Sequence, residues 1–186
     1  MTRLPAVLCS DDLPEAELHA AKLDGELYQV DHCFSPIDEI EARHSRARSV
    51  LLSVPLRLIA EQRTAAWIHG AGTFPPAHHQ FCADISARAS TSRLTGVTVR
   101  EVVIDNTELI DVGGLRVTTP LRTAVDLARR KFEFTVEDSR VIAELMRMGE
   151  FGVAECQEVL ERRRNLPNKR IALQRLTEAA LLTTQN

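Results

Sequence analysis

Hydrophobic and polar positions divide the chain into a first part of mixed elements, a middle part of strands and a last part of helices. In the first part, residues 11–14 (DDLP) are typical of a helix start, and Gly25 ends that helix. Residues 26–30 (ELYQV) alternate as a strand does. Residues 34–36 (FSP) then predict the start of a second helix, which continues through residues 39–53. This order is compatible with a reduced winged-helix element.

The next segment predicts a third helix and then several strands. Pro55 begins a helix that ends at Gly70. From residue 78 to 118 the chain contains short runs rich in β-branched residues. Two pairs, Asp105-Asn106 and Gly113-Gly114, separate the later runs as hairpin turns do.

After residue 119 the pattern predicts four helices, at residues 120–131, 136–148, 153–164 and 168–183. We therefore expect an α/β (α+β) fold in two parts. Residues 1–54 form a small winged-helix-like part. Residues 55–186 form a domain of short, mostly antiparallel strands packed with helices, and a helical tail ends the chain.

One stretch, GGLRVTTPLRTAVDLARR at residues 113–130, combines a turn, a strand and a helix. Thr119 is placed to cap the helix, and Pro120 suits its first position. Arg122 then has two interpretations. It grips an anion near the helix start, or it bridges to Asp126 one turn later in a strand-to-helix joint. Because no glycine-rich phosphate loop surrounds the stretch, we favour the joint.

Composition narrows the function classes. The net charge of −3 excludes a uniformly basic nucleic-acid coat, and residues 1–34 hold two basic and seven acidic residues, a net charge of −5. No apolar run approaches the roughly 20 residues of a membrane span, and the start is a poor signal peptide, so we expect a cytoplasmic protein. The four cysteines form no C-x-x-C pair, which favours reduced side chains that pack as small apolar residues.

Two clusters of basic residues are candidate binding surfaces. On the predicted second helix, the candidate DNA contacts are Arg43, His44, Arg46 and Arg48. The alternative is a solvated surface in which these residues pair with Glu39 and Glu41. Near the C-terminus, a candidate patch for nucleic acid or an acidic partner consists of Arg162, Arg163, Arg164, Lys169 and Arg170. The alternative there is two solvated helix ends.

Catalytic and metal chemistry have little support in the sequence. His78, His79 and Cys82 lie together, but a structural zinc site needs four ligands, and neighbouring strand residues point oppositely. We expect no metal and no cofactor. His69 is expected to cap a helix end or to bond a neighbour. No local spacing suggests a nucleophile with its base, although such groups can meet from distant positions.

Two motifs carry a family resemblance. RTAAWIHGA (63–71) and GLRVTTPLRTAVDLAR (114–129) resemble the AbiEi-type antitoxin family of bacterial type IV toxin–antitoxin systems, with related actinobacterial proteins of unknown function. The structural motif residues implied are Arg63, His69, Thr119, Arg122 and Asp126. The resemblance also implies an N-terminal winged helix.

The function implied is a DNA-binding transcriptional regulator, not an enzyme, that represses its own operon and counteracts a nucleotidyltransferase-type toxin. Operator DNA, that toxin and a second copy of the chain are the candidate partners. Two departures stand out: Gln62 occupies a position where the family tends to have histidine, and residues 1–34 are acidic. The alternative function is a protein-interaction module of the same fold that has lost DNA binding. An enzyme with a scattered active site is the third hypothesis, and nothing in the sequence supports it.

Overall fold

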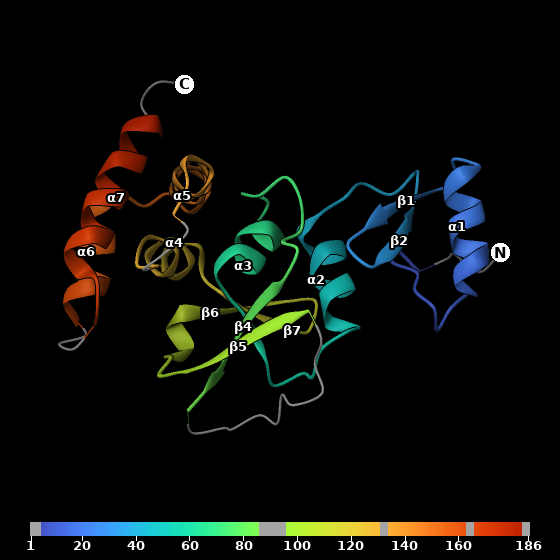
Figure 1. Cartoon of the computed structure of the whole chain (residues 1–186), viewed down its shortest axis with the longest axis horizontal. Helices are drawn as coiled ribbons and strands as arrows, with labels where there is room; N and C mark the ends of the chain where they lie inside the picture. Colours follow the sequence, from blue (N-terminus) through green and yellow to red (C-terminus); the bar gives the residue numbers. More distant parts are fainter. Residues whose placement is uncertain (1–4, 86–95, 131–133, 163–165, 184–186) are drawn as a thin grey trace. The chain divides into compact units, whose positions relative to one another are not determined.

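The computed structural model describes residues 5–85, 96–130, 134–162 and 166–183. The chain divides into two compact units. Unit 1 comprises residues 1–56 and Asp111–Leu115, and unit 2 comprises Arg57–Ile110 and Arg116–Asn186. Figure 1 labels the helices and strands of both. In the part of the chain described, no helix is both long and apolar enough to cross a lipid bilayer.

Unit 1 is built on a small hairpin between two helices. Its elements are α1 (Glu15–Leu23), β1 (Leu27–Val30), β2 (Cys33–Pro36) and α2 (Arg43–Leu51). The two strands pair antiparallel, with Leu27 opposite Pro36 and Val30 opposite Cys33. A small core of Leu8, Leu18, Leu27 and Phe34 lies beneath them. The strand predicted at residues 26–30 is therefore confirmed, one residue shorter.

The predicted helix start at residues 34–36 is wrong, because these residues form β2. Ser35 caps no helix; it lies opposite Tyr28 in the hairpin, and its hydroxyl donates to the carbonyl of Ala6 at 2.7 Å. The helix begins only at Arg43. The local cap-like sequence was outweighed by pairing with the preceding strand, which buries Phe34.

In the residues that the structure describes, unit 2 contains one sheet and five α-helices. In chain order it contains β3 (Ile59–Ala60), α3 (Gln62–His69), β4 (His79–Asp84), β5 (Val97–Val102), a 3-10 turn (Asn106–Glu108), β6 (Leu109–Val112), β7 (Leu115–Thr118), α4 (Pro120–Ala128), α5 (Val136–Gly149), α6 (Val153–Arg162) and α7 (Lys169–Thr183). The tip of the β6–β7 hairpin is the segment grouped with unit 1.

The sheet has the strand order β5-β4-β3-β7-β6. The central strand β3 is antiparallel to β4 and parallel to β7, and β4 is parallel to β5. Since Gly113-Gly114 joins β6 to β7 in two residues, that neighbouring pair is antiparallel. Three of the five neighbouring pairs among the described strands thus run antiparallel. The predicted α/β fold of short, mostly antiparallel strands ending in a helix is confirmed.

Two local predictions in this region are wrong. The helix expected from Pro55 begins only at Gln62, because Ile59 and Ala60 form the central strand and are fully buried between β4 and β7. Asp105-Asn106 is not a hairpin turn, since β5 and β6 lie at opposite edges of the sheet. Asp105 instead accepts the amide of Thr107 at 2.8 Å and caps the 3-10 turn.

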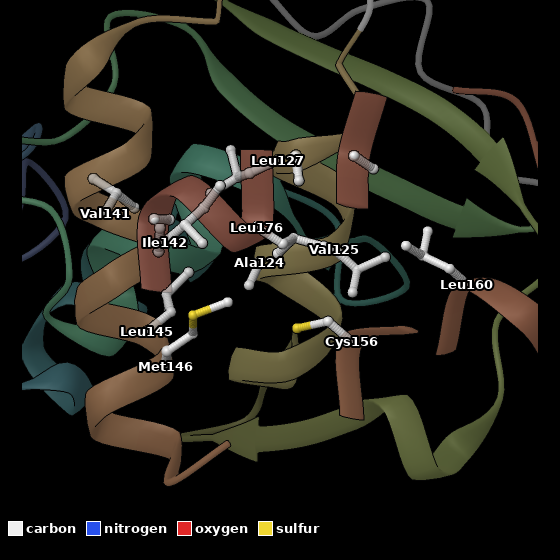
Figure 2. Close-up of a cluster of buried hydrophobic side chains, with 14 residues drawn as sticks. Ala124, Val125, Leu127, Val141, Ile142, Leu145, Met146, Cys156, Leu160 and Leu176 are labelled. Atoms are coloured by element: carbon white, nitrogen blue, oxygen red, sulfur yellow. The ribbon is translucent and has the colours of Figure 1, made fainter. Parts of the chain in front are cut away.

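The helices α4 to α7 share one hydrophobic core. Figure 2 shows side chains from all four pointing toward one another, with Leu127, Ile142, Cys156 and Leu176 among them. Figure 1 shows these helices gathered together in unit 2. The four predicted helices are confirmed, with ends that differ by up to three residues wherever the ends are described.

Candidate functional site

The first candidate surface is the outward side of α2. Ala47 and Val50 on its inner side are fully buried, which fixes the helix on unit 1. Its exposed basic side chains are Arg43, His44 and Arg48, here called the α2 basic face. The helix contains no acidic residue, so this face carries positive charge that no neighbour within α2 neutralises.

Arg46, the fourth basic residue of α2, has a different environment. Its Nε donates to Glu41 Oε1 at 2.6 Å, and its side chain is only 16% exposed. The pairing with Glu41 is the arrangement that the solvated-surface interpretation expected for the cluster. Arg46 therefore fastens the start of α2 to the preceding loop, whereas Arg43, His44 and Arg48 point to solvent.

A second candidate site is a network of buried charges in unit 2. Its centre is Asp126 on α4, whose side chain is 1% exposed. Three arginines donate to its carboxylate: Arg122 Nε at 2.8 Å, Arg129 Nη1 at 3.1 Å and Arg100 Nη2 at 3.0 Å. One buried carboxylate thus joins β5 to two turns of α4.

Two further carboxylates balance these arginines. Glu61 accepts both Nε and Nη2 of Arg100, at 2.5 and 2.6 Å. Glu108 accepts Nη1 of Arg122 at 2.6 Å. The six side chains form the Asp126 network: Glu61, Arg100, Glu108, Arg122, Asp126 and Arg129. With three cations and three anions it is neutral, which meets the condition for burying charge.

Burial and pairing act in opposite directions on the pKa values of this network. Burial raises the pKa of Glu61, and the hydrogen bonds and charge of Arg100 oppose the rise. Burial acts to lower the pKa of Arg122, but the charges of Asp126 and Glu108 outweigh it and the pKa is raised. Arg122 therefore stays protonated, and its charge is neutralised inside the protein by Asp126 and Glu108.

The stretch at residues 113–130 is a strand-to-helix joint. Thr119 Oγ1 accepts the amide of Arg122 at 3.3 Å, and Pro120 occupies the first turn of α4, as the sequence predicts. The predicted bridge from Arg122 to Asp126 is present, and Glu108 holds the other side of the guanidinium. Because Arg122 is buried between the carboxylates of Glu108 and Asp126, an anion could bind Arg122 only by displacing one of these carboxylates.

The R-T-A-A-x-x-H-G helix is α3, and its polar residues also make structural contacts. Arg63 donates Nε and Nη2 to the two oxygens of Asp138, both at 2.9 Å, and so ties α3 to α5. His69 Nε2 lies 2.7 Å from the carbonyl oxygen of Thr118. The expectation that His69 bonds a neighbour is confirmed, and the bond ties α3 to β7.

The basic patch near the C-terminus is only partly placed. Arg162 ends α6 and lies 3.5 Å from Glu158, with both side chains exposed. Lys169 and Arg170 begin α7. Arg163 and Arg164 lie outside the described residues, and binding by this patch stays a prediction.

Three of the four cysteines behave as apolar residues. Cys33, Cys82 and Cys156 are buried. Burial raises the pKa of Cys33 and of Cys156 to about 12, and burial beside Glu61 raises that of Cys82 further. These thiols are therefore protonated near neutral pH and are poor nucleophiles.

Comparison with known proteins identifies the fold of unit 2. The family described as the AbiEi antitoxin C-terminal domain matches residues 58–173. The chain belongs to this family. The matched AbiEi domain runs from just before β3 into α7 and contains every residue of the Asp126 network, together with Arg63 and Asp138. The resemblance expected from the two motifs is thereby confirmed.

One solved structure is distantly similar to this chain. The crystal structure of the RV2827C protein from Mycobacterium tuberculosis aligns with a TM-score of 0.47 and 18% sequence identity, over 97% of this chain and 72% of that chain. No curated protein matches the chain.

Four members of the Asp126 network were not predicted from the sequence: Glu61, Arg100, Glu108 and Arg129. Glu61 and Arg100 are 39 residues apart, and no local spacing links them. The sequence gives no clear signal for either residue, because Glu61 is followed by Gln62 and Arg63, and Arg100 by Glu101. The α2 basic face precedes the matched residues.

Replacing Asp138 of the AbiEi domain by asparagine is expected to reduce the acid sensitivity of folding. Burial acts to raise the pKa of Asp138, but hydrogen bonds from Arg63 and Thr135 and the charge of Arg63 outweigh it, so the pKa lies below its ordinary 3.8. The stabilisation is fully present above pH 3.8 and is lost as the pH falls through the lowered pKa. Urea denaturation at pH ~7 and pH ~3 should show a smaller difference between variant and wild type at the lower pH. An unchanged difference would contradict the assignment.

Proposed function

We propose that the chain is a non-enzymatic, antitoxin-type transcriptional regulator that binds operator DNA through the α2 basic face. The observation that carries the proposal is the exposure of Arg43, His44 and Arg48 on a helix without acidic residues, in a chain that belongs to the AbiEi antitoxin domain family. Arginines on an exposed helix suit contacts with backbone phosphates and base edges.

The charge of the rest of unit 1 decides how such binding behaves. Acidic residues are exposed on and around α1, including Glu15, Glu17 and Asp24. These carboxylates repel phosphates over distances comparable to the Debye length, about 10 Å at 0.1 M salt. We therefore expect modest affinity and strong weakening by salt, with contacts confined to α2.

The finer points of the proposal follow from the family resemblance. They are repression of the chain's own operon, action against a nucleotidyltransferase-type toxin and a cytoplasmic location. The buried charges of the AbiEi domain are consistent with a non-catalytic role, because Arg122 and Asp126 form an ion pair with each other inside the domain. The domain would then present its surface to partners, while α2 contacts DNA.

The deciding experiment measures the affinity for duplex DNA from upstream of the gene by fluorescence anisotropy, at several salt concentrations. Each phosphate contact adds about 0.9 to the slope of log affinity against log salt. The double variant Arg43→Gln/Arg48→Gln is expected to bind more weakly and to lose about 1.8 from that slope.

Arg46→Gln is the matched control on the same helix, because its side chain is held by Glu41. We expect it to keep the wild-type slope, even where it lowers stability. Absence of wild-type binding at low salt and micromolar protein would refute the DNA-binding proposal. An equal loss of slope in the control would show that α2 is disturbed as a whole.

A second candidate function is a protein-interaction module that has lost DNA binding. The exposed acidic residues of unit 1 favour it: Asp11, Asp12, Glu15, Glu17, Asp24 and Glu26. This function predicts that the chain suppresses the toxicity of a co-expressed neighbouring toxin in cells, and that the purified chain does not shift the upstream DNA. The proposed regulator predicts both effects, so the two measurements together separate the functions.

A further inference from the structure

A groove on the AbiEi domain lies apart from the Asp126 network. It has a volume of about 580 Å³ and runs between α3, the loop that follows it and the first turns of α5. Ala66, Pro76 and Val141 provide apolar lining, and the Arg63–Asp138 pair also borders it. Its size falls within the roughly 300–1,000 Å³ of typical binding pockets. We call it the α3–α5 groove.

Two large apolar side chains stand exposed beside this groove. Phe74, which lines it, is 81% exposed, and Val136 in the first turn of α5 is 70% exposed. Single exposed apolar residues are ordinary on a protein surface. Phe74 differs from such isolated residues because it stands beside an apolar groove. The same surface therefore carries both a projecting aromatic ring and a cavity that could accept an aromatic ring.

The charges on the exposed side of α5 have the same self-complementary character. Glu137 and Arg140 are both exposed and form an ion pair on one side of the helix, with Arg140 Nη1 3.6 Å from Glu137 Oε2. When two identical helices pack antiparallel about a two-fold axis between these positions, Glu137 of each faces Arg140 of the other. A patch that matches itself in this manner is what a two-fold symmetric contact requires.

We infer that the α3–α5 groove is the contact surface for a second copy of this chain. Each Phe74 enters the groove of the other copy, where Ala66 and Val141 line the cavity. Around this contact, Glu137 and Arg140 exchange partners between the copies. The inference concerns self-association alone and does not rest on the proposed DNA contact.

Sedimentation velocity of the full chain without DNA, over roughly 1–100 µM, tests the inference. Wild type is expected to form a dimer within this range. Phe74→Asp is expected to be monomeric, and Phe74→Ala to dissociate at least about tenfold more readily. Leu23→Asp is the control, because Leu23 is an equally exposed apolar residue of unit 1; this variant should dimerise as wild type does.

A charge exchange provides a second and independent readout. Glu137→Arg places like charges opposite one another across the axis and should weaken the dimer by about tenfold. The double variant Glu137→Arg/Arg140→Glu restores opposite charges and should regain most of the affinity. Circular dichroism confirms that each variant is folded. A wild-type monomer at every concentration overturns the inference, as does a dimer that is insensitive to Phe74→Asp.

Discussion

Asp126→Asn is expected to lower the free energy of unfolding by about 3–5 kcal/mol, the usual cost of removing one partner from a buried ion pair. The substitution keeps the size of the side chain and removes only its charge. Arg100, Arg122 and Arg129 all donate to this carboxylate, so the variant leaves an excess of buried positive charge. Chemical denaturation followed by far-ultraviolet circular dichroism measures the effect.

The matched control for this substitution is Glu144→Gln. Glu144 accepts Arg147 Nη2 at 2.6 Å, a contact as short as those in the Asp126 network, but this pair is exposed on α5. Exposed ion pairs contribute little to stability, so the control should unfold almost as wild type does. Equal losses in the two variants would mean that burial does not set the importance of Asp126.

Sequence predictions succeeded where a few neighbouring residues decide the structure. Gly113-Gly114 supports a tight turn, with φ angles of +62° and +90°, and Thr119 with Pro120 defines the start of α4. The bridge between Arg122 and Asp126 spans a single helical turn, so its spacing was visible in the sequence. Each of these features depends on local geometry, which the order of neighbouring residues in the sequence reveals directly.

Predictions failed where a distant strand decides the structure. Residues 34–36 resemble a helix start, but pairing with β1 makes them a strand. Ile59 and Ala60 continue a helical pattern, yet they take the centre of a sheet whose other strands lie more than 15 residues away. Intrinsic preference is a weak signal when tertiary pairing of this kind opposes it.

The candidate sites show the same division. The basic residues of α2 are evident from the sequence, whereas the separate role of Arg46 depends on where Glu41 lies. Likewise, Arg122 was expected to meet Asp126, but the addition of Arg100 and Glu61 required the sheet to bring β5 beside α4. Long-range partners of a charged residue cannot be read from spacing along the chain.

Leu176→Ala is expected to lower the free energy of unfolding by about 2–5 kcal/mol, the range for a large-to-small change in a core. Leu176 is fully buried on α7, where Ala172 and Ala179 complete one apolar stripe. The family match ends at residue 173, so Leu176 lies beyond it. The prediction therefore states that α7 is an integral part of the domain core, through contacts with the helices shown in Figure 2.

Ile171→Ala on the same helix is the control for this change. Ile171 is 46% exposed and lies outside the buried stripe, so its truncation removes less packing and should have a much smaller effect. Both variants are compared with wild type by urea denaturation at one protein concentration. If Leu176→Ala costs no more than Ile171→Ala, α7 is not part of the cooperative core. A large and specific loss would mean that the folded domain requires the residues beyond 173.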